Sequence, residues 1–296
     1  MTATSVRDIY FHESLLDVRE VYAADRVGWL QTTGLLLFTP DAIVSGQVSA
    51  GVRLLDMAGF RPVATGLVHI DRLKCREIWR RELIGMEPET LDRLAVCDLL
   101  FPYTDSIAML LRDERPVAGL PASQRLSRLK GSGEPALREP GTLRRQLSSP
   151  NNVFRLVHAS DGPDELVREL GILFDVRRRR ELLYDARHGH ASADEIQRFA
   201  ARAIEPVGAR DLDTTPSLRR VSAAVQTRLR HTTEDPVPRN LPEQLARLGT
   251  GTGRGFRALR DALEAASVPL DTWDLIALGA VALAHPAAAA PTGEGS

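Results

Sequence analysis

Short apolar runs that end at turn residues and lead into helical patterns constrain the fold of this chain most. The first run, residues 34–38, stops at Thr39-Pro40-Asp41, and apolar residues at helical spacing then continue to Gly59. An apolar run of this length between turn residues is typical of a buried strand. We therefore expect a strand followed by a helix here, after a leading helical stretch over residues 6–29.

Three further apolar runs continue this alternation. Residues 61–70, 105–113 and 153–157 are predicted strands. A charged helical insert separates the strand at 61–70 from the strand at 105–113, and a helix is predicted over 163–174. This order favours an α+β fold of the ferredoxin-like βαββαβ type, with an antiparallel four-stranded sheet and packed helices.

The character of the chain changes after the arginine run at residues 177–180. Residues 181–230 and 256–284 are rich in Ala, Leu and Arg at helical spacing, whereas a Pro- and Gly-rich interval over 232–255 interrupts them. The C-terminal region is therefore predicted to be all-helical. We divide the chain into four parts: an N-terminal helical segment (1–30), an α+β domain (31–180), a helical extension (181–285) and a disordered tail (286–296).

Charge and cysteine content narrow the possible partners. A net charge of -1 provides no bulk attraction to nucleic acid or acidic lipid. The longest apolar run, residues 275–284, is too short to span a bilayer. We expect no nucleic-acid or membrane partner. Cys75 and Cys97 form neither a disulfide framework nor a metal-ligand spacing, which favours a cytoplasmic location.

One histidine stands in a distinctive context. The segment Pro-Gly-Thr-Leu-Arg ends at Arg144; His158-Ala-Ser-Asp follows fourteen residues later, and Glu169 lies on the predicted helix behind it. With "LLLFTPDAI", "GFRPVATGLVHI" and "SIAMLL" before them in the same order, these blocks make residues 33–175 resemble nucleoside diphosphate kinases. The resemblance covers about half of the chain.

The resemblance implies a phosphotransferase that moves the γ-phosphoryl group of a nucleoside triphosphate through a phosphohistidine to a nucleotide-like acceptor. His158 would carry the phosphate, and Glu169 and Ser160 would hold its ring. Arg144 would contact the phosphates, with Arg128 or Arg125 as a second arginine. The resemblance also implies Mg²⁺ bound through the nucleotide phosphates, without a protein metal site, and a homo-oligomer.

Several positions depart from the family pattern. Thr39, which by its position is also expected at the phosphates, stands where the family has a phosphate-binding lysine. Ala159 replaces the glycine after the histidine, and Arg155 replaces an asparagine. Two hypotheses follow. A divergent phosphotransferase is favoured by the retained His158, Ser160, Glu169 and Arg144. A non-catalytic nucleotide-binding or protein-interaction module is favoured by the loss of the lysine.

Overall fold

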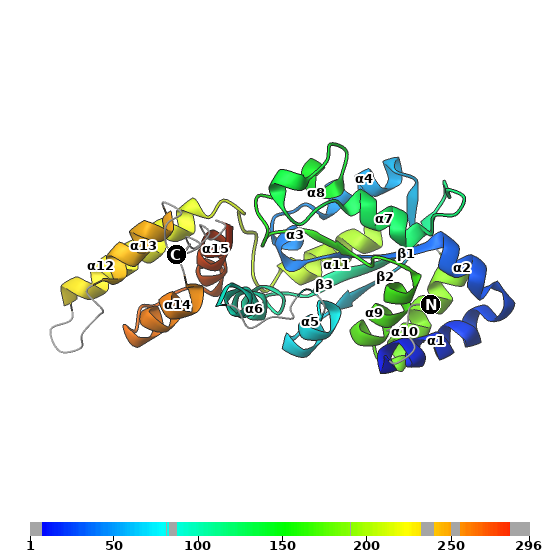
Figure 1. Ribbon diagram of the computed structural model, residues 1–296, viewed down its shortest axis with the longest axis horizontal. Coiled ribbons are helices and arrows are strands. Elements are labelled where there is room, and N and C mark those ends of the chain that lie inside the picture. The colour runs from blue at the N-terminus through cyan, green and yellow to red at the C-terminus, as the bar shows by residue number, and fades with distance from the viewer. Residues whose placement is uncertain are drawn as a thin grey trace, which may run out of the picture. The chain divides into compact units, whose positions relative to one another are not determined.

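The computed structural model describes residues 8–80, 82, 88–189, 191–231, 240–249 and 255–284 (Figure 1). The predicted tail, 286–296, lies outside the described residues. The described residues form two compact units. The first draws on Met1–Leu83, Leu100–Pro150 and Phe154–Leu212, and the second on Ile84–Leu99, Asn151–Val153 and Asp213–Ser296.

A four-stranded antiparallel sheet forms the centre of the first unit (Figure 1). Its strands are β1 (Thr33–Phe38), β2 (Phe60–Val68), β3 (Ser106–Asp113) and β4 (Val157–Ala159), in the spatial order β2-β3-β1-β4. β3 therefore lies between β1 and β2, and β1 lies between β3 and β4, so that two βαβ units interleave. The predicted ferredoxin-like α+β class is confirmed.

Side-chain alternation along the strands supplies apolar residues to both faces of the sheet. On one face, Leu36 and Phe38 share a core with Ile107 and Met109 and with apolar residues of helices α4, α7 and α11. On the other face lie α9 and α10, which pack on β1 and β2, while α1 packs on α9 and α10. The helices of the first unit are α1 (Ile9–Tyr22), α2 (Arg26–Thr32), α3 (Pro40–Val44), α4 (Val48–Met57), α5 (Arg72–Ile78), α7 (Ala122–Lys130), α8 (Leu143–Gln146), α9 (Pro163–Leu173), α10 (Val176–His188) and α11 (Ala193–Ile204), with short 3-10 helices at Ala23–Asp25 and Pro135–Leu137.

A buried arginine fastens the N-terminal helix to this unit. The Arg179 side chain on α10 is 0 % exposed and bonds through Nε to Oδ2 of Asp17 on α1 at 2.6 Å. Its Nη2 also lies 3.0 Å from Oε1 of Glu13. Because a buried charge requires such partners, the pair holds α1 and α10 together.

The second unit is helical. Its described helices are α6 (Pro88–Leu100), of which the residues up to Leu99 belong to this unit, α12 (Thr215–His231), α13 (Leu241–Gly249), α14 (Phe256–Ala265) and α15 (Thr272–Ala284). Each of these helices contributes apolar side chains to one core. The buried carboxylate of Asp92 on α6 accepts the backbone N–H groups of Phe256 and Arg257 and so caps α14. Among the described helices, none is long and apolar enough to cross a membrane.

Three sequence predictions need correction. The fourth strand, predicted at 153–157, runs over Val157–Ala159, because Leu156 has a left-handed backbone (φ 64°) that interrupts extended structure. The Pro- and Gly-rich interval contains helix α13, because Leu241, Leu245 and Leu248 bury an apolar stripe in the second core. The segment 181–285 is divided between the units, since α10 and α11 belong to the first.

Candidate functional site

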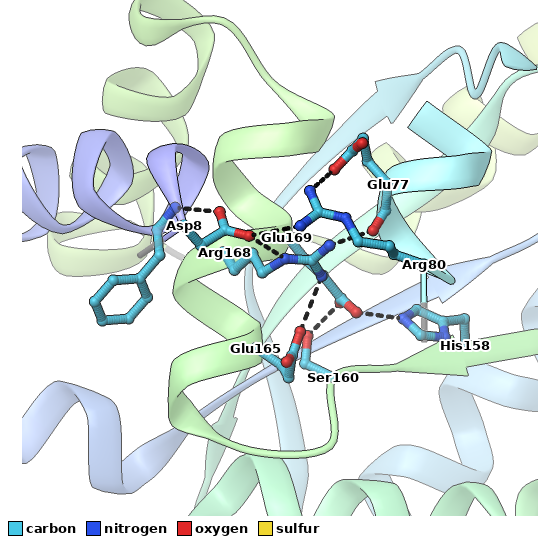
Figure 2. Close-up of polar contacts among 9 residues, drawn as sticks. Asp8, Glu77, Arg80, His158, Ser160, Glu165, Arg168 and Glu169 are labelled. Carbon is cyan, nitrogen blue, oxygen red and sulfur yellow. Dashed lines mark hydrogen bonds and ion pairs between the residues drawn. The ribbon is translucent and has the colours of Figure 1, made fainter. Parts of the chain in front are cut away.

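The structure brings together the three residues predicted to form the catalytic group. His158 lies in the middle of β4, and its Nε2 is 2.8 Å from Oε1 of Glu169 on α9 (Figure 2). The second carboxylate oxygen, Oε2, accepts a hydrogen bond from Ser160 Oγ at 2.5 Å. The side chains of His158 and Glu169 are only 12 % and 4 % exposed. One buried carboxylate therefore holds both the imidazole and the hydroxyl.

Helix α9 places Glu169 beside His158. It starts with Pro163 at its first turn, where proline is well tolerated, and carries Asp164 and Glu165 near its positive end. Its buried face includes Leu166 and Leu170, which place Glu169 toward the sheet. The helix also packs closely on α1, because a Cβ on Gly171 would lie 2.4 Å from a backbone oxygen of Tyr10.

The shared carboxylate selects one tautomer of the imidazole. An ionised carboxylate only accepts hydrogen bonds, and the two oxygens of Glu169 each face one donor. Nε2 therefore carries the ring proton, and Nδ1 keeps the lone pair. Within the described part of the chain, no hydrogen bond engages Nδ1. The geometry therefore leaves the lone pair of His158 Nδ1 available to a ligand.

Trp79, directly after α5, is a site residue that sequence reasoning missed. Its ring makes an edge contact with the imidazole of His158, with centroids 5.3 Å apart and an interplanar angle of 78°. Phe101 stacks on Trp79 at 4.4 Å. Both aromatic residues lie within the 71–104 insert, where the sequence offers no pattern that would place them against the histidine.

Two cations cover the outer edge of β4. Register places the polar backbone groups of His158 toward β1, so the carbonyls of Val157 and Ala159 point away from the sheet. Arg144 Nη2 donates to the Val157 oxygen at 2.8 Å, and Lys130 Nζ donates to the Ala159 oxygen at 2.9 Å. Lys130 also pairs with Asp161 at 2.9 Å. The strand that carries the histidine is thus held from both sides.

Arg144, predicted to contact phosphates, is occupied by the protein backbone. It is 6 % exposed, and besides Val157 it donates to the carbonyls of Gly131 (2.8 Å) and Arg155 (3.3 Å). Burial lowers its pKa to about 9, and nearby Arg155 adds to this. The guanidinium therefore binds the loop before β4 to the strand.

Thr39 is likewise used internally. Its buried Oγ1 donates to Oδ1 of Asp41 at 2.6 Å, and Oδ2 of the same carboxylate accepts the backbone N–H of Leu156 at 2.8 Å. Burial raises the pKa of Asp41, while these hydrogen bonds act in the opposite direction. Thr39 thus supports the left-handed Leu156, two residues before the histidine.

The two remaining arginine candidates differ in their availability. Arg125 binds Asp113 through two nitrogens, at 2.7 and 2.5 Å, and donates to the Ala58 carbonyl. Arg128 is exposed on α7, and no ion pair engages it among the described residues. Of the predicted phosphate-binding side chains, Arg128 is the one open to a ligand.

The part of the chain that the structure describes contains no group of three His, Cys, Asp or Glu side chains able to hold a metal ion. His188 is among these residues, whereas His190 lies outside the described part of the chain.

Comparisons with known proteins place this site in context. No protein-family model matches the chain. A nucleoside diphosphate kinase from Thermomicrobium roseum is 25% identical over 144 residues, which cover 47% of this chain and 85% of that protein.

Solved structures of the same description were also found. One is an NDP kinase from Pyrobaculum aerophilum, with a TM-score of 0.40, 21% identity, and coverage of 49% of this chain and 97% of that chain. Another is a Borrelia burgdorferi nucleoside-diphosphate kinase with bound vanadate and ADP, with a TM-score of 0.40, 18% identity, and coverage of 57% and 96%. Over about half of its length, the chain is thus similar to a nucleoside diphosphate kinase.

Proposed function

We propose that this protein is a phosphotransferase that forms a phosphohistidine at Nδ1 of His158. The observation that carries the proposal is the shared carboxylate of Glu169, which accepts from His158 and from Ser160. A histidine with only a structural role requires one hydrogen-bond partner, whereas here the partner is itself oriented by a second donor. This arrangement is a nucleophile supported by a carboxylate, with a third group that orients the carboxylate, as in other sites of covalent catalysis.

The chemistry follows from this geometry. The Nδ1 lone pair attacks the γ-phosphorus of a nucleoside triphosphate, the bond to the bridging oxygen breaks, and the nucleoside diphosphate leaves. The proton stays on Nε2, where the negative charge of Glu169 offsets the positive charge that develops on the ring. In the second half-reaction a nucleotide-like acceptor attacks the phosphorus, and the lone pair returns to Nδ1.

Magnesium enters this proposal as part of the substrate. The carboxylates near His158 are already used, since Glu169 accepts two hydrogen bonds and Asp161 pairs with Lys130. A magnesium–nucleotide complex, with the ion held by phosphate oxygens, is the substrate form that fits these residues. The relative from Thermomicrobium roseum, named as a nucleoside diphosphate kinase, supports a nucleotide as the phosphoryl donor.

Incubation of the full chain with γ-labelled nucleoside triphosphate and Mg²⁺ tests the proposal. We expect acid-labile label on the protein and its loss in His158→Ala. His69→Ala is the matched control, because His69 also pairs with a carboxylate, through Nδ1 to Asp105 at 3.2 Å, but is exposed. Label that persists in His158→Ala, or a parent that labels with none of the common nucleotides, would contradict the proposal.

A non-catalytic nucleotide-binding module is the second candidate. It is favoured by the internal use of Thr39 and Arg144, which leaves few cations for a phosphate chain. The same experiment separates the two candidates, because a binding module would retain nucleotide in equilibrium dialysis without becoming labelled.

A further inference from the structure

We infer that Trp79 is a positioning residue for the His158 ring, and that Arg168 and Asp8 hold Trp79 in place. This inference rests on the proposed function, since it concerns the same histidine. It adds a requirement for the insert after β2 and for the N-terminal helix, neither of which supplies the nucleophile.

The rings of Trp79 and His158 are in direct contact. Glu169 holds one nitrogen of the imidazole, but a single hydrogen bond still permits the ring to swing about that nitrogen. The Trp79 ring, 5.3 Å away by centroid and nearly perpendicular, removes this freedom. Phe101, stacked on Trp79 at an interplanar angle of 25°, keeps the indole itself in one orientation.

Trp79 is held at the end of α5, which is itself fixed to α9. Its backbone N–H closes the last turn of α5 on Cys75 O at 3.2 Å. The end of α5 is then fixed to α9, because Arg168 Nη2 donates to the backbone carbonyl of Glu77 (Figure 2). Arg168 immediately precedes Glu169 in α9. Two adjacent residues of one helix therefore set the two contacts of the imidazole, one directly and the other through α5.

Arg168 is also linked to the N-terminal helix α1, through Asp8. Asp8, which is buried, accepts from Arg168 Nε at 3.0 Å and lies 3.5 Å from Nη1 of Arg80 (Figure 2). Its other oxygen caps α1 by accepting the N–H of Phe11 at 3.2 Å. Glu165 binds a further nitrogen of Arg168 at 3.0 Å. The carboxylates of Asp8 and Glu165 thus orient the guanidinium of Arg168, which donates to α5.

A loose ring has a kinetic cost. In-line transfer requires Nδ1 at a defined place before the γ-phosphorus, and a misplacement of about 1 Å can lower a rate about a hundred-fold. We therefore expect a slower first transfer in variants that free the ring, with folding and nucleotide binding retained.

The experiment combines NMR with labelling kinetics on the full chain. The Cε1–H signal of His158, assigned in ¹³C-histidine-labelled protein by comparison with His158→Gln, reports the ring current of Trp79 without any nucleotide. We expect this signal to shift in Trp79→Ala and in Arg168→Gln. The rate of labelling by nucleoside triphosphate should fall about ten- to a hundred-fold in Trp79→Ala. Trp79→Phe, which keeps an aromatic ring, should retain most of the rate and remains usable if the alanine variant fails to fold.

Matched variants distinguish positioning from general destabilisation. Trp29→Phe removes another indole of the same unit, one that stacks on Tyr22 at 4.9 Å, and should leave both the His158 signal and the labelling rate unchanged. Asp8→Asn keeps a good helix cap but removes the negative charge that pairs with Arg168. It should shift the His158 signal in the same direction as Arg168→Gln, by a smaller amount.

An unchanged His158 signal in both Trp79→Ala and Arg168→Gln would overturn the inference, as would a labelling rate equal to that of the parent. If the signal shifts but no protein, including the parent, becomes labelled, the proposed phosphotransfer fails while the positioning of the ring stands.

Discussion

The two sides of strand β4 differ in how completely the protein satisfies its own polar groups. On the side of the imidazole, Glu169 and Ser160 complete a hydrogen-bonded group that leaves Nδ1 open. Of the residues expected to bind phosphates, Arg144 donates its hydrogen bonds to backbone carbonyls and Thr39 donates to Asp41. For the proposed phosphotransferase, support of the nucleophile and binding of its substrate are therefore separable features. The first is built in, and the second must draw on other cations, of which Arg128 is exposed.

The largest expected effect lies on the imidazole side. Glu169→Gln places an amide where a carboxylate accepted two hydrogen bonds, so its NH₂ group can face Nε2 and move the ring proton to Nδ1. We expect labelling of His158 to slow by up to about ten-thousand-fold, the loss found in a catalytic triad where an amide selects the wrong tautomer.

Ser160→Ala provides the graded comparison, because it removes one donor and leaves the acceptor of His158; a loss of about ten-fold is expected. If Glu169→Gln labels at the parental rate, the shared carboxylate has no part in the reaction. The built-in support on this side of β4 would then be structural only.

An intermediate effect is expected on the other side. Arg144→Gln leaves the carbonyls of Gly131, Arg155 and Val157 short of donors in a buried place, so the free energy of unfolding should fall by about 3 kcal/mol. Urea unfolding measures this change. Arg145→Gln is the matched control, since the neighbouring side chain is exposed, and should alter stability by less than about 0.5 kcal/mol. Unchanged stability in Arg144→Gln, together with weaker nucleotide binding, would instead assign Arg144 to the phosphates.

The smallest effect concerns Asp41 and is measured as a pH dependence. Burial raises the pKa of this carboxyl, so the folded state binds its proton more tightly than the unfolded state does. Its contribution to stability is full below the unfolded pKa of about 3.9 and is lost as pH rises through the folded pKa. The unfolding free energy of the parent minus that of Asp41→Asn should therefore decrease as the pH rises above about 4.

Thr39→Val complements this measurement, because it removes only the hydroxyl bonded to Asp41 and should cost about 1 kcal/mol at neutral pH without slowing labelling. A parent-to-variant difference that grows with pH in Asp41→Asn would mean that the hydrogen bonds of the carboxylate outweigh its burial.

Much of the sheet was predictable because its signals are local. Apolar runs bounded by turn residues placed β1, β2 and β3 within two residues of their observed bounds, and the pattern after Pro163 placed α9. β4 was misplaced because Phe154 and Leu156 are apolar and fully buried yet lie outside the ladder. No local pattern announces the positive φ of Leu156, which depends on a carboxylate more than a hundred residues earlier in the chain.

The candidate site divides in the same way. The grouping of His158, Ser160 and Glu169 could be anticipated, because they lie on one strand, directly after it and on the following helix. The role of Trp79 could not, since it depends on how the 71–104 insert returns to the sheet. The inward orientation of Arg144 could not be read either, because an arginine in a loop has the same sequence whether it donates to a phosphate or to three carbonyls.

The covered edge of β4 also has a consequence for self-association. Of the four strands, β2 and β4 are at the ends of the sheet, where unpaired carbonyls can template a strand from another molecule. The carbonyls of Val157 and Ala159 are already occupied by Arg144 and Lys130. A second copy cannot extend the sheet there without displacing two cations, so edge-to-edge pairing at the histidine strand is discouraged and any assembly of copies must use other surfaces.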